Sequence, residues 1–172
     1  MNVDASQAHP DRDRNEEGLP ENARPRDRFG APLPRDAQNE LTDRVEPEDV
    51  CTTVDEAIDT AADLFGQQRF FEAHEFFEWA WKGPVTPEED RSFFKGMAQL
   101  AVGYTHTQRG NLAGAQTLLQ RGIDHIGPYD SPHYGIDVDR AISDVQAFIA
   151  DLRDRAPGPG LDFPPFPRDP KA

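Results

Sequence analysis

The stretch "FFKGMAQLAVGYTH", residues 93–106, decides the fold, because hydrophobic residues occur on nearly every side of the helix that it predicts. A helix of this kind is buried by neighbours on several sides. At about 100° per residue, four small or polar residues fall on one stripe of this helix: Gly96, Gln99, Gly103 and His106. The glycines would let another helix approach closely, at about 1 kcal/mol each in helix propensity. We therefore predict a buried central helix over residues 93–109.

Start and stop signals place four further helices around the central one. The clearest is "TVDE", residues 53–56, a capping box that opens a helix. "TPEE", residues 86–89, opens the central helix in the same way, with Thr86 as the N-cap. The other predicted helices span 54–66, 69–82, 112–126 and 138–155. Since no long segment alternates with period two, the predicted fold class is all-α, a multihelical bundle of about five helices.

The segment before the helical domain (residues 51–156) has a different composition. Residues 1–50 are acidic, contain Pro and Arg, and lack apolar periodicity, so we expect them to be disordered-like or loosely docked. Within them, "NARPRDRFGAPLPRD", residues 22–36, fits two descriptions. It is either an extended linker or an arm whose arginines and Phe29 dock onto the acidic domain.

The chain ends in a Pro-rich segment, residues 157–172, with the sequence "PGPGLDFPPFPRDPKA". Proline and glycine exclude a helix there, so the segment should be extended. Three of its side chains could still pack on the bundle: Leu161, Phe163 and Phe166.

Composition excludes several functions. The chain has 32 acidic against 18 basic residues and a formal net charge of −14, which opposes binding to a phosphate backbone, so we expect no nucleic-acid partner. No apolar run is long enough to span a membrane, and the N-terminus lacks the apolar region of a secretory signal. A single cysteine, Cys51, excludes an internal disulfide. We expect a cytoplasmic protein without a membrane partner.

The candidate site comes from "RFFEAHEFFEWAWKG", residues 69–83. On a helical projection His74 and Glu78 share a face with aromatic side chains, and we predict that this face meets the polar stripe of the central helix. A pocket would then lie between helices 69–82 and 93–109. The predicted catalytic residues are His74, Glu78 and His106, and the predicted binding residues are Trp81, Gln99 and Phe70.

The residue types suggest a chemistry for this pocket. The Glu78 carboxylate would fix the tautomer of His74 and raise its basicity, which makes a general base with His106 as the acid partner. Gln99 would polarise an oxygen, and the aromatic side chains would form an apolar wall. Glu75 points off this face and is expected to be solvated.

Two other hypotheses fit the same residues. The His/Glu pair could be a structural buried network in a non-enzymatic interaction module of tetratricopeptide-like helical hairpins. His74, Glu78 and His106 could instead ligate one metal ion, although "HEFFE", residues 74–78, lacks the second histidine of a zinc-protease motif. The expected partner is a small molecule or a protein, and the residues indicate no particular cofactor.

Three motifs in order resemble the prokaryotic helical family known as domain of unknown function 309. They are "HEFFEWAW" with His74, Glu75, Glu78 and Trp81; "GMAQLA", residues 96–101; and "GNLAGA", residues 110–115. The similarity covers roughly residues 54–126, and the arm resembles extensions of actinobacterial members. The resemblance implies a multihelical bundle around one buried helix, and it brings no activity, substrate or cofactor.

Overall fold

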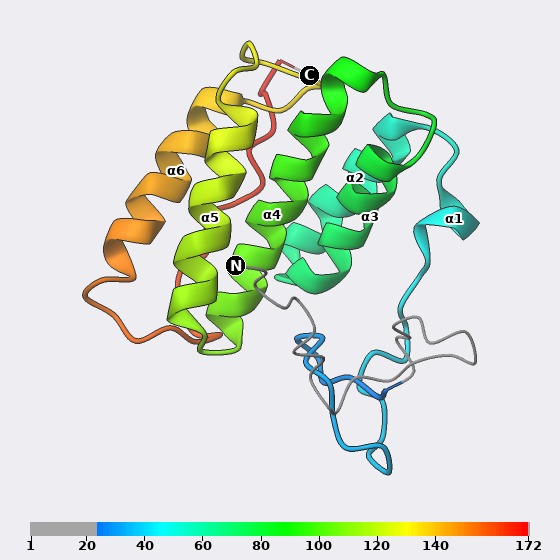
Figure 1. Ribbon diagram of the computed structural model, residues 1–172, viewed down its shortest axis with the longest axis vertical. Helices are drawn as coiled ribbons and strands as arrows, with labels where there is room; N and C mark the ends of the chain where they lie inside the picture. Colours follow the sequence, from blue (N-terminus) through cyan, green and yellow to red (C-terminus); the bar gives the residue numbers. More distant parts are fainter. Residues whose placement is uncertain (1–23, 172) are drawn as a thin grey trace, which may run out of the picture.

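The computed structural model describes residues 24–171, and within them it confirms the all-α prediction (Figure 1). A 3-10 turn, Glu88–Asp90, precedes the central helix. The five long helices match the predicted ones, and the short α1 was not predicted. The helices are α1 (Pro47–Val50), α2 (Val54–Gly66), α3 (Phe70–Lys82), α4 (Arg91–Gln108), α5 (Leu112–Ile126) and α6 (Val138–Asp151).

Three of the predicted helix starts have side-chain caps, and the first of these caps was predicted. At α2, the Thr53 hydroxyl accepts from the backbone N–H of Glu56, whose carboxylate accepts from the backbone N–H of Thr53. Asn111 and Asp137 cap α5 and α6, each through an N–H three residues further on. These bonds satisfy donors that a helix N-terminus otherwise leaves unpaired.

The start of α4 differs from the prediction. Thr86 does not cap this helix, because the backbone of Pro87 is still extended, with ψ at 146°. The chain passes through the 3-10 turn Glu88–Asp90, and α4 begins at Arg91.

Helix α4 is central, as predicted, and it packs between α3 and α5 (Figure 1). Most of its residues are buried, including Phe93, Phe94, Met97 and Tyr104. The burial of an almost uniformly apolar helix on several sides is the main source of the hydrophobic core.

The glycine stripe of α4 faces α5 and not α3. A Cβ on Gly96 would lie 2.7 Å from Cγ2 of Ile126, and a Cβ on Gly103 would lie 2.6 Å from Cγ of Leu119. Gly122 of α5 completes this seam. The close helix approach was therefore correctly expected, but the prediction that the stripe meets the His74 face is wrong.

The C-terminal segment is extended and packs along the bundle as the red trace in Figure 1. The ring of Phe163 lies 4.9 Å from that of Phe70 and 5.4 Å from that of Phe148. The ring centres of Phe166 and Phe65 are 5.4 Å apart. These ring contacts make the segment part of the core.

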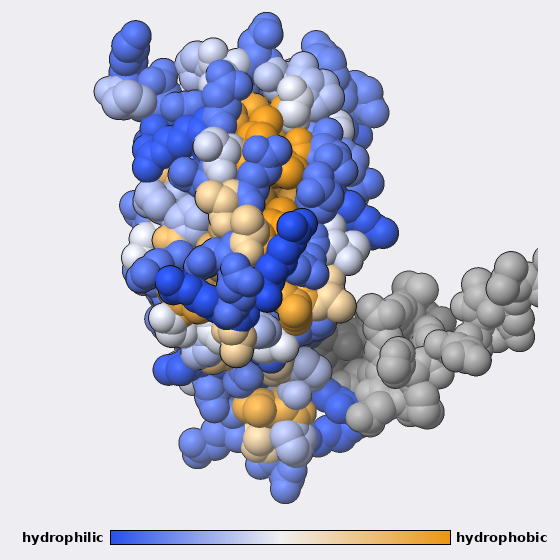
Figure 2. Space-filling view, turned by 90° about the vertical axis from the view of Figure 1, so that its left-hand side faces the viewer, coloured by the Kyte–Doolittle hydropathy of each residue, from blue (hydrophilic) through white to orange (hydrophobic). Residues whose placement is uncertain are grey.

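The surface agrees with the strongly acidic composition. Figure 2 shows that the side on which α6 lies is mainly hydrophilic, with a narrow band of hydrophobic residues between the polar ones. In residues 24–171, no helix combines the length and apolarity that crossing a bilayer requires. Residues 1–23 of the predicted arm, and Ala172, lie outside the described residues.

Candidate functional site

The outer face of α3 is covered by the N-terminal arm, which we define as residues 24–46. Gly30 sits so closely on the Phe71 ring that an added Cβ would be 2.2 Å from its Cγ. The guanidinium groups of Arg26 and Arg109 lie 5.2 and 5.5 Å from the centre of the same ring. Leu41 is buried as well. The described part of the arm is thus docked on the helical domain.

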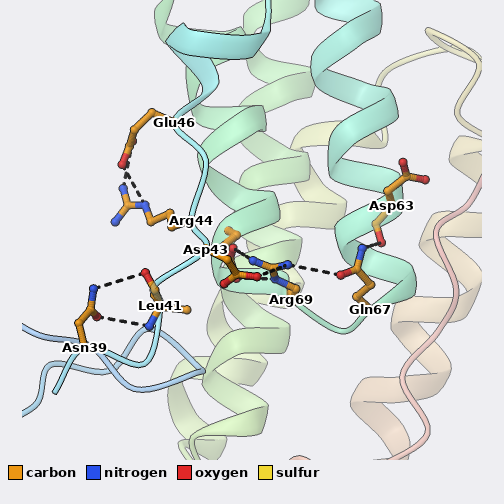
Figure 3. A network of polar contacts seen from close by, with 9 residues as sticks. Asn39, Leu41, Asp43, Arg44, Glu46, Asp63, Gln67 and Arg69 are labelled. Carbon is orange, nitrogen blue, oxygen red and sulfur yellow. Dashed lines mark hydrogen bonds and ion pairs between the residues drawn. The ribbon is translucent and has the colours of Figure 1, made fainter.

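Polar contacts hold the arm near the N-terminal end of α3. Arg109, at the end of α4, donates from Nε and Nη2 to the carbonyl oxygen of Phe29, at 3.0 and 2.8 Å. Figure 3 shows a second group of contacts at the turn between α2 and α3, where Arg69 pairs with Asp43 at 3.3 Å. The arm is therefore held by charged contacts to two different parts of the domain.

His74 lies beneath the arm in a local network. Its Nδ1 contacts the backbone carbonyl oxygen of Phe71, which fixes the proton on that nitrogen. Its Nε2 lies 3.7 Å from Oε2 of Glu78. Burial lowers the pKa of His74 despite this carboxylate, so the imidazole is a weaker base than we predicted.

Two predicted binding residues lie elsewhere. Phe70, which was predicted as a binding residue, is 1% exposed and packs in the aromatic core against Phe163. Trp81 is partly buried, with the ammonium of Lys95 from α4 5.6 Å from its ring centre. A face about 120° wide on a helical projection includes both core-facing and surface-facing positions, which is why these residues were grouped with His74.

Among the described residues, no hydrogen bond joins Gln99 or His106 of α4 to His74, although we predicted that they would meet. Asn111, which caps α5, donates from its amide nitrogen to Nδ1 of His106 at 3.1 Å. Partial burial and the neighbouring Arg109 lower the pKa of His106. The buried Oε1 of Gln99 has no hydrogen-bond partner in the described structure. His106 thus lies in the last turn of α4 and contacts the N-cap of α5.

The side chain of Glu75 is largely buried, so the prediction that it is solvated is wrong. Its side chain is only 13% exposed, and its Oε1 pairs with Nη2 of Arg44 at 2.6 Å. Its Oε2 is buried without a hydrogen-bond partner in the described structure. Burial raises the pKa of Glu75 to about 7, an effect that Arg44 opposes and that Glu46 and other nearby carboxylates increase. A perturbed carboxyl group of this kind is a common property of functional sites.

The arginines of the arm were the signal that could have identified Glu75. The docked-arm hypothesis covered residues 22–36 and so did not include Arg44, and it gave no position on the acidic domain for any arginine. The burial of Glu75 depends on that position, because α3 alone would leave its side chain in water.

Glu75 borders an open hollow of about 470 Å³ between α1 and α3. Both helices contribute polar side chains, and α3 also contributes an indole. The lining includes Glu46, Glu48, Glu75, Glu78, Trp79 and Lys82. Lys82 pairs with Glu78 one turn away. The remaining carboxylates give this hollow an acidic character.

The alternative of a metal site finds no support in the geometry. Across residues 24–171, no three His, Cys, Asp or Glu side chains come together in a way that could hold a metal ion. His74 and Glu78 are close to each other, but His106 accepts a hydrogen bond from Asn111, the N-cap of α5.

Comparison with known proteins finds a family that is similar to part of the helical domain. Residues 58–118 match the family described as "Domain of unknown function (DUF309)". Residues 58–118, which we call the DUF309 region, are therefore similar to this family, as the motifs predicted. The DUF309 region contains all of α3 and α4, and therefore Glu75, Glu78 and Trp79. The arm and α1 precede it, so the hollow lies where the DUF309 region meets its N-terminal extension.

One curated relative is similar to this region. It is "Uncharacterized protein YpuF" of Bacillus subtilis (strain 168), which is 35% identical over 66 residues. The aligned part covers 38% of this chain and 37% of that protein, so the chain matches little more than a third of the relative's length. No solved structure matches the chain significantly.

Proposed function

We propose that the protein binds a small organic cation in the hollow between α1 and α3. The observation that carries this proposal is the buried Glu75 carboxyl group, which borders a space large enough for a small molecule. Glu46 and Glu48 add negative charge from the other side of the hollow. The indole of Trp79 supplies an aromatic surface of the kind that attracts cations.

The charge of the lining favours binding of a cation over acyl hydrolysis. A carboxyl group with a pKa near 7 would suit a general acid or base. Acyl hydrolysis also needs donors directed at a developing oxyanion. Carboxylates repel an oxyanion, and the Lys82 ammonium that borders the hollow is paired with Glu78. We therefore favour reversible binding.

In this proposal His74 supports the site without contacting the ligand. Its contact with the Phe71 carbonyl and its proximity to Glu78 are those of a structural network within α3. That network agrees with the hypothesis that the His/Glu pair has a structural role. It does not account for Glu75, whose burial beside an open space supports the proposal of a binding site.

Calorimetric titration at pH 8 tests the proposal, with n-butylamine, choline and agmatine as probes. The site variant is Glu75→Gln, and the matched control is Glu88→Gln, which removes the same charge from an exposed side chain outside the hollow. We expect at least one probe to bind the wild type and the control equally, and to bind Glu75→Gln about tenfold more weakly or worse. No binding to the wild type, or equal binding to all three proteins, would contradict the proposal.

A further inference from the structure

We infer that the ligand of the hollow carries a planar guanidinium or amidinium group, which replaces the guanidinium of Arg44 on Glu75 and thereby releases the arm. This inference rests on the proposed function. It adds the chemical class of the cation and makes Arg44 an internal occupant that competes with it.

The structure already contains a guanidinium at this carboxylate. Arg44 lies between two acids, with Nη2 2.6 Å from Oε1 of Glu75 and Nε 3.2 Å from Oε1 of Glu46. Glu75 belongs to α3, whereas Glu46 belongs to the arm and also borders the hollow. The arm therefore places a cation at the edge of the space that we propose for the ligand.

The contact between Arg44 and Glu75 is incomplete. Arg44 pairs with Oε1, while the buried Oε2 of Glu75 has no hydrogen-bond partner in the described structure. Leaving a buried acceptor unpaired is unfavourable, and a guanidinium can bond both oxygens of one carboxylate through two parallel N–H groups. A free ligand can adopt that orientation, whereas Arg44 is restrained by the backbone of the arm and by its contact with Glu46.

The same hollow shows why a simple ammonium is a poorer candidate. The ammonium of Lys82 borders the hollow and pairs with Glu78, while Glu75 is matched with a guanidinium. An ammonium is a point charge and lacks the planar fork that fits both carboxylate oxygens. Trp79 at the wall also favours a flat cation, because a guanidinium can stack on an aromatic ring.

Replacement of Arg44 would loosen the arm as a whole. Arg44 is one of its charged attachments to the domain, together with the Asp43–Arg69 pair and the Arg109 contact to Phe29. Asp43 and Arg44 are close in sequence to each other and to the buried Leu41, so the loss of the Arg44 contact weakens the attachment of this part of the arm. Release would uncover Phe71 and His74 of α3. Ligand binding and arm docking are then linked equilibria, each opposing the other.

Hydrogen exchange of the full-length chain tests this inference, read by mass spectrometry over residues 24–46. Agmatine is the guanidinium probe, and n-butylamine at the same concentration is the amine control. We expect agmatine to bind more tightly than n-butylamine and to accelerate exchange in the arm, with little effect on α4 and α5.

The variant Arg44→Gln removes the internal occupant, and Arg121→Gln on the exposed side of α5 is its control. Arg44→Gln should exchange rapidly in the arm without any probe. It should also bind agmatine about tenfold more tightly than the wild type, because the guanidinium of Arg44 no longer competes with the ligand for Glu75. Circular dichroism checks that both variants keep the helical fold.

The outcomes separate the two proposals. If cations bind but agmatine is not preferred, or if it binds without a change in arm exchange, the inference fails and the proposed function stands. If the wild type and Arg44→Gln bind agmatine with equal affinity, the inference also fails and the proposed function stands. If no probe binds either protein, both proposals fail.

Discussion

Arg109, at the end of α4, donates two hydrogen bonds to the backbone carbonyl oxygen of Phe29, 80 residues earlier in the chain. Hydrogen bonds from charged donors are stronger than those between neutral groups. This contact holds the arm on the outer face of α3, and Arg44 of the same arm pairs with Glu75, whose side chain is 13% exposed. The unusual carboxyl group is thus a product of tertiary structure between the arm and the DUF309 region.

Replacement of Gly30 by alanine should release the arm and leave the bundle folded. Gly30 has φ at 73°, which an L-residue rarely adopts, and its added Cβ would overlap the Phe71 ring at 2.2 Å. We expect faster amide exchange over residues 24–46 with unchanged helical circular dichroism. Gly158→Ala, where no atom lies within 4 Å of the added carbon, is the control. Normal protection of the arm in Gly30→Ala would show that the docked arrangement is wrong.

Replacement of Gly96 by alanine should destabilise the seam between α4 and α5. Alanine favours a helix by about 1 kcal/mol over glycine, but its Cβ would lie 2.7 Å from Ile126 and 2.9 Å from the backbone oxygen of Gly122. We expect the steric overlap to outweigh the gain in helix propensity, with a net loss of about 1–3 kcal/mol in the free energy of unfolding. Urea denaturation measures this loss.

Gly66→Ala is the matched control for the seam. Gly66 lies at the end of α2 with nothing within 4 Å of the added carbon, so alanine should be neutral or stabilising by up to about 1 kcal/mol. Similar effects at Gly66 and Gly96 would mean that α4 and α5 are not in close contact.

Truncation of Phe163 tests whether the C-terminal segment belongs to the core. Its ring lies 4.9 Å from that of Phe70 and 5.9 Å from that of Tyr104. We expect Phe163→Ala to lower the free energy of unfolding by about 2–3 kcal/mol, less than for a fully buried phenylalanine. The exposed neighbour change Asp162→Ala should have little effect. A loose tail would make the two variants equivalent.

The helices were predictable because their signals are local. Thr53, Asn111 and Asp137 each satisfy N–H groups within three residues, so a short sequence window contains the whole interaction. The Gly96 stripe is a different case. A helical projection identifies the stripe as a site of close approach, but it carries no information about which neighbouring helix makes the contact.

The candidate site was less predictable because its properties depend on residues distant in sequence. Glu75 is adjacent to His74 on α3, and a helical projection assigns it to solvent. Its burial comes from the arm, a segment with no hydrophobic periodicity, and its partner Arg44 lies 31 residues away. The predicted pair His74 and Glu78 does come together, since positions four apart share a helix face.

The raised pKa of Glu75 makes stability depend on pH with a definite sign. Burial favours the protonated form in the folded state, so the folded protein holds this proton up to about pH 7, against 4.5 for an ordinary glutamate. The folded state binds more protons than the unfolded state in this window, so the contribution of Glu75 to stability falls as pH rises from 4.5 to 7. The charged groups that face it are Arg44, Glu46, Glu72 and Glu78.

Urea denaturation of the wild type and of Glu75→Gln at pH 5 and pH 8 measures this contribution. We expect the wild type to lose stability relative to Glu75→Gln between the two values, while Glu88→Gln follows the wild type. The comparison between variants is needed because burial lowers the pKa of His74, which acts in the opposite direction on acidification. A constant difference between the wild type and Glu75→Gln would exclude a shifted pKa.

The carboxyl carbon of Glu75 can be observed directly by ¹³C NMR during a pH titration of the full-length protein. Its assignment comes from the resonance lost in Glu75→Gln. We expect a midpoint of about 7, and a lower midpoint in Gly30→Ala, where the arm no longer covers the side chain. A midpoint near 4.5 in the wild type would contradict the claim that the arm and α3 together create this site.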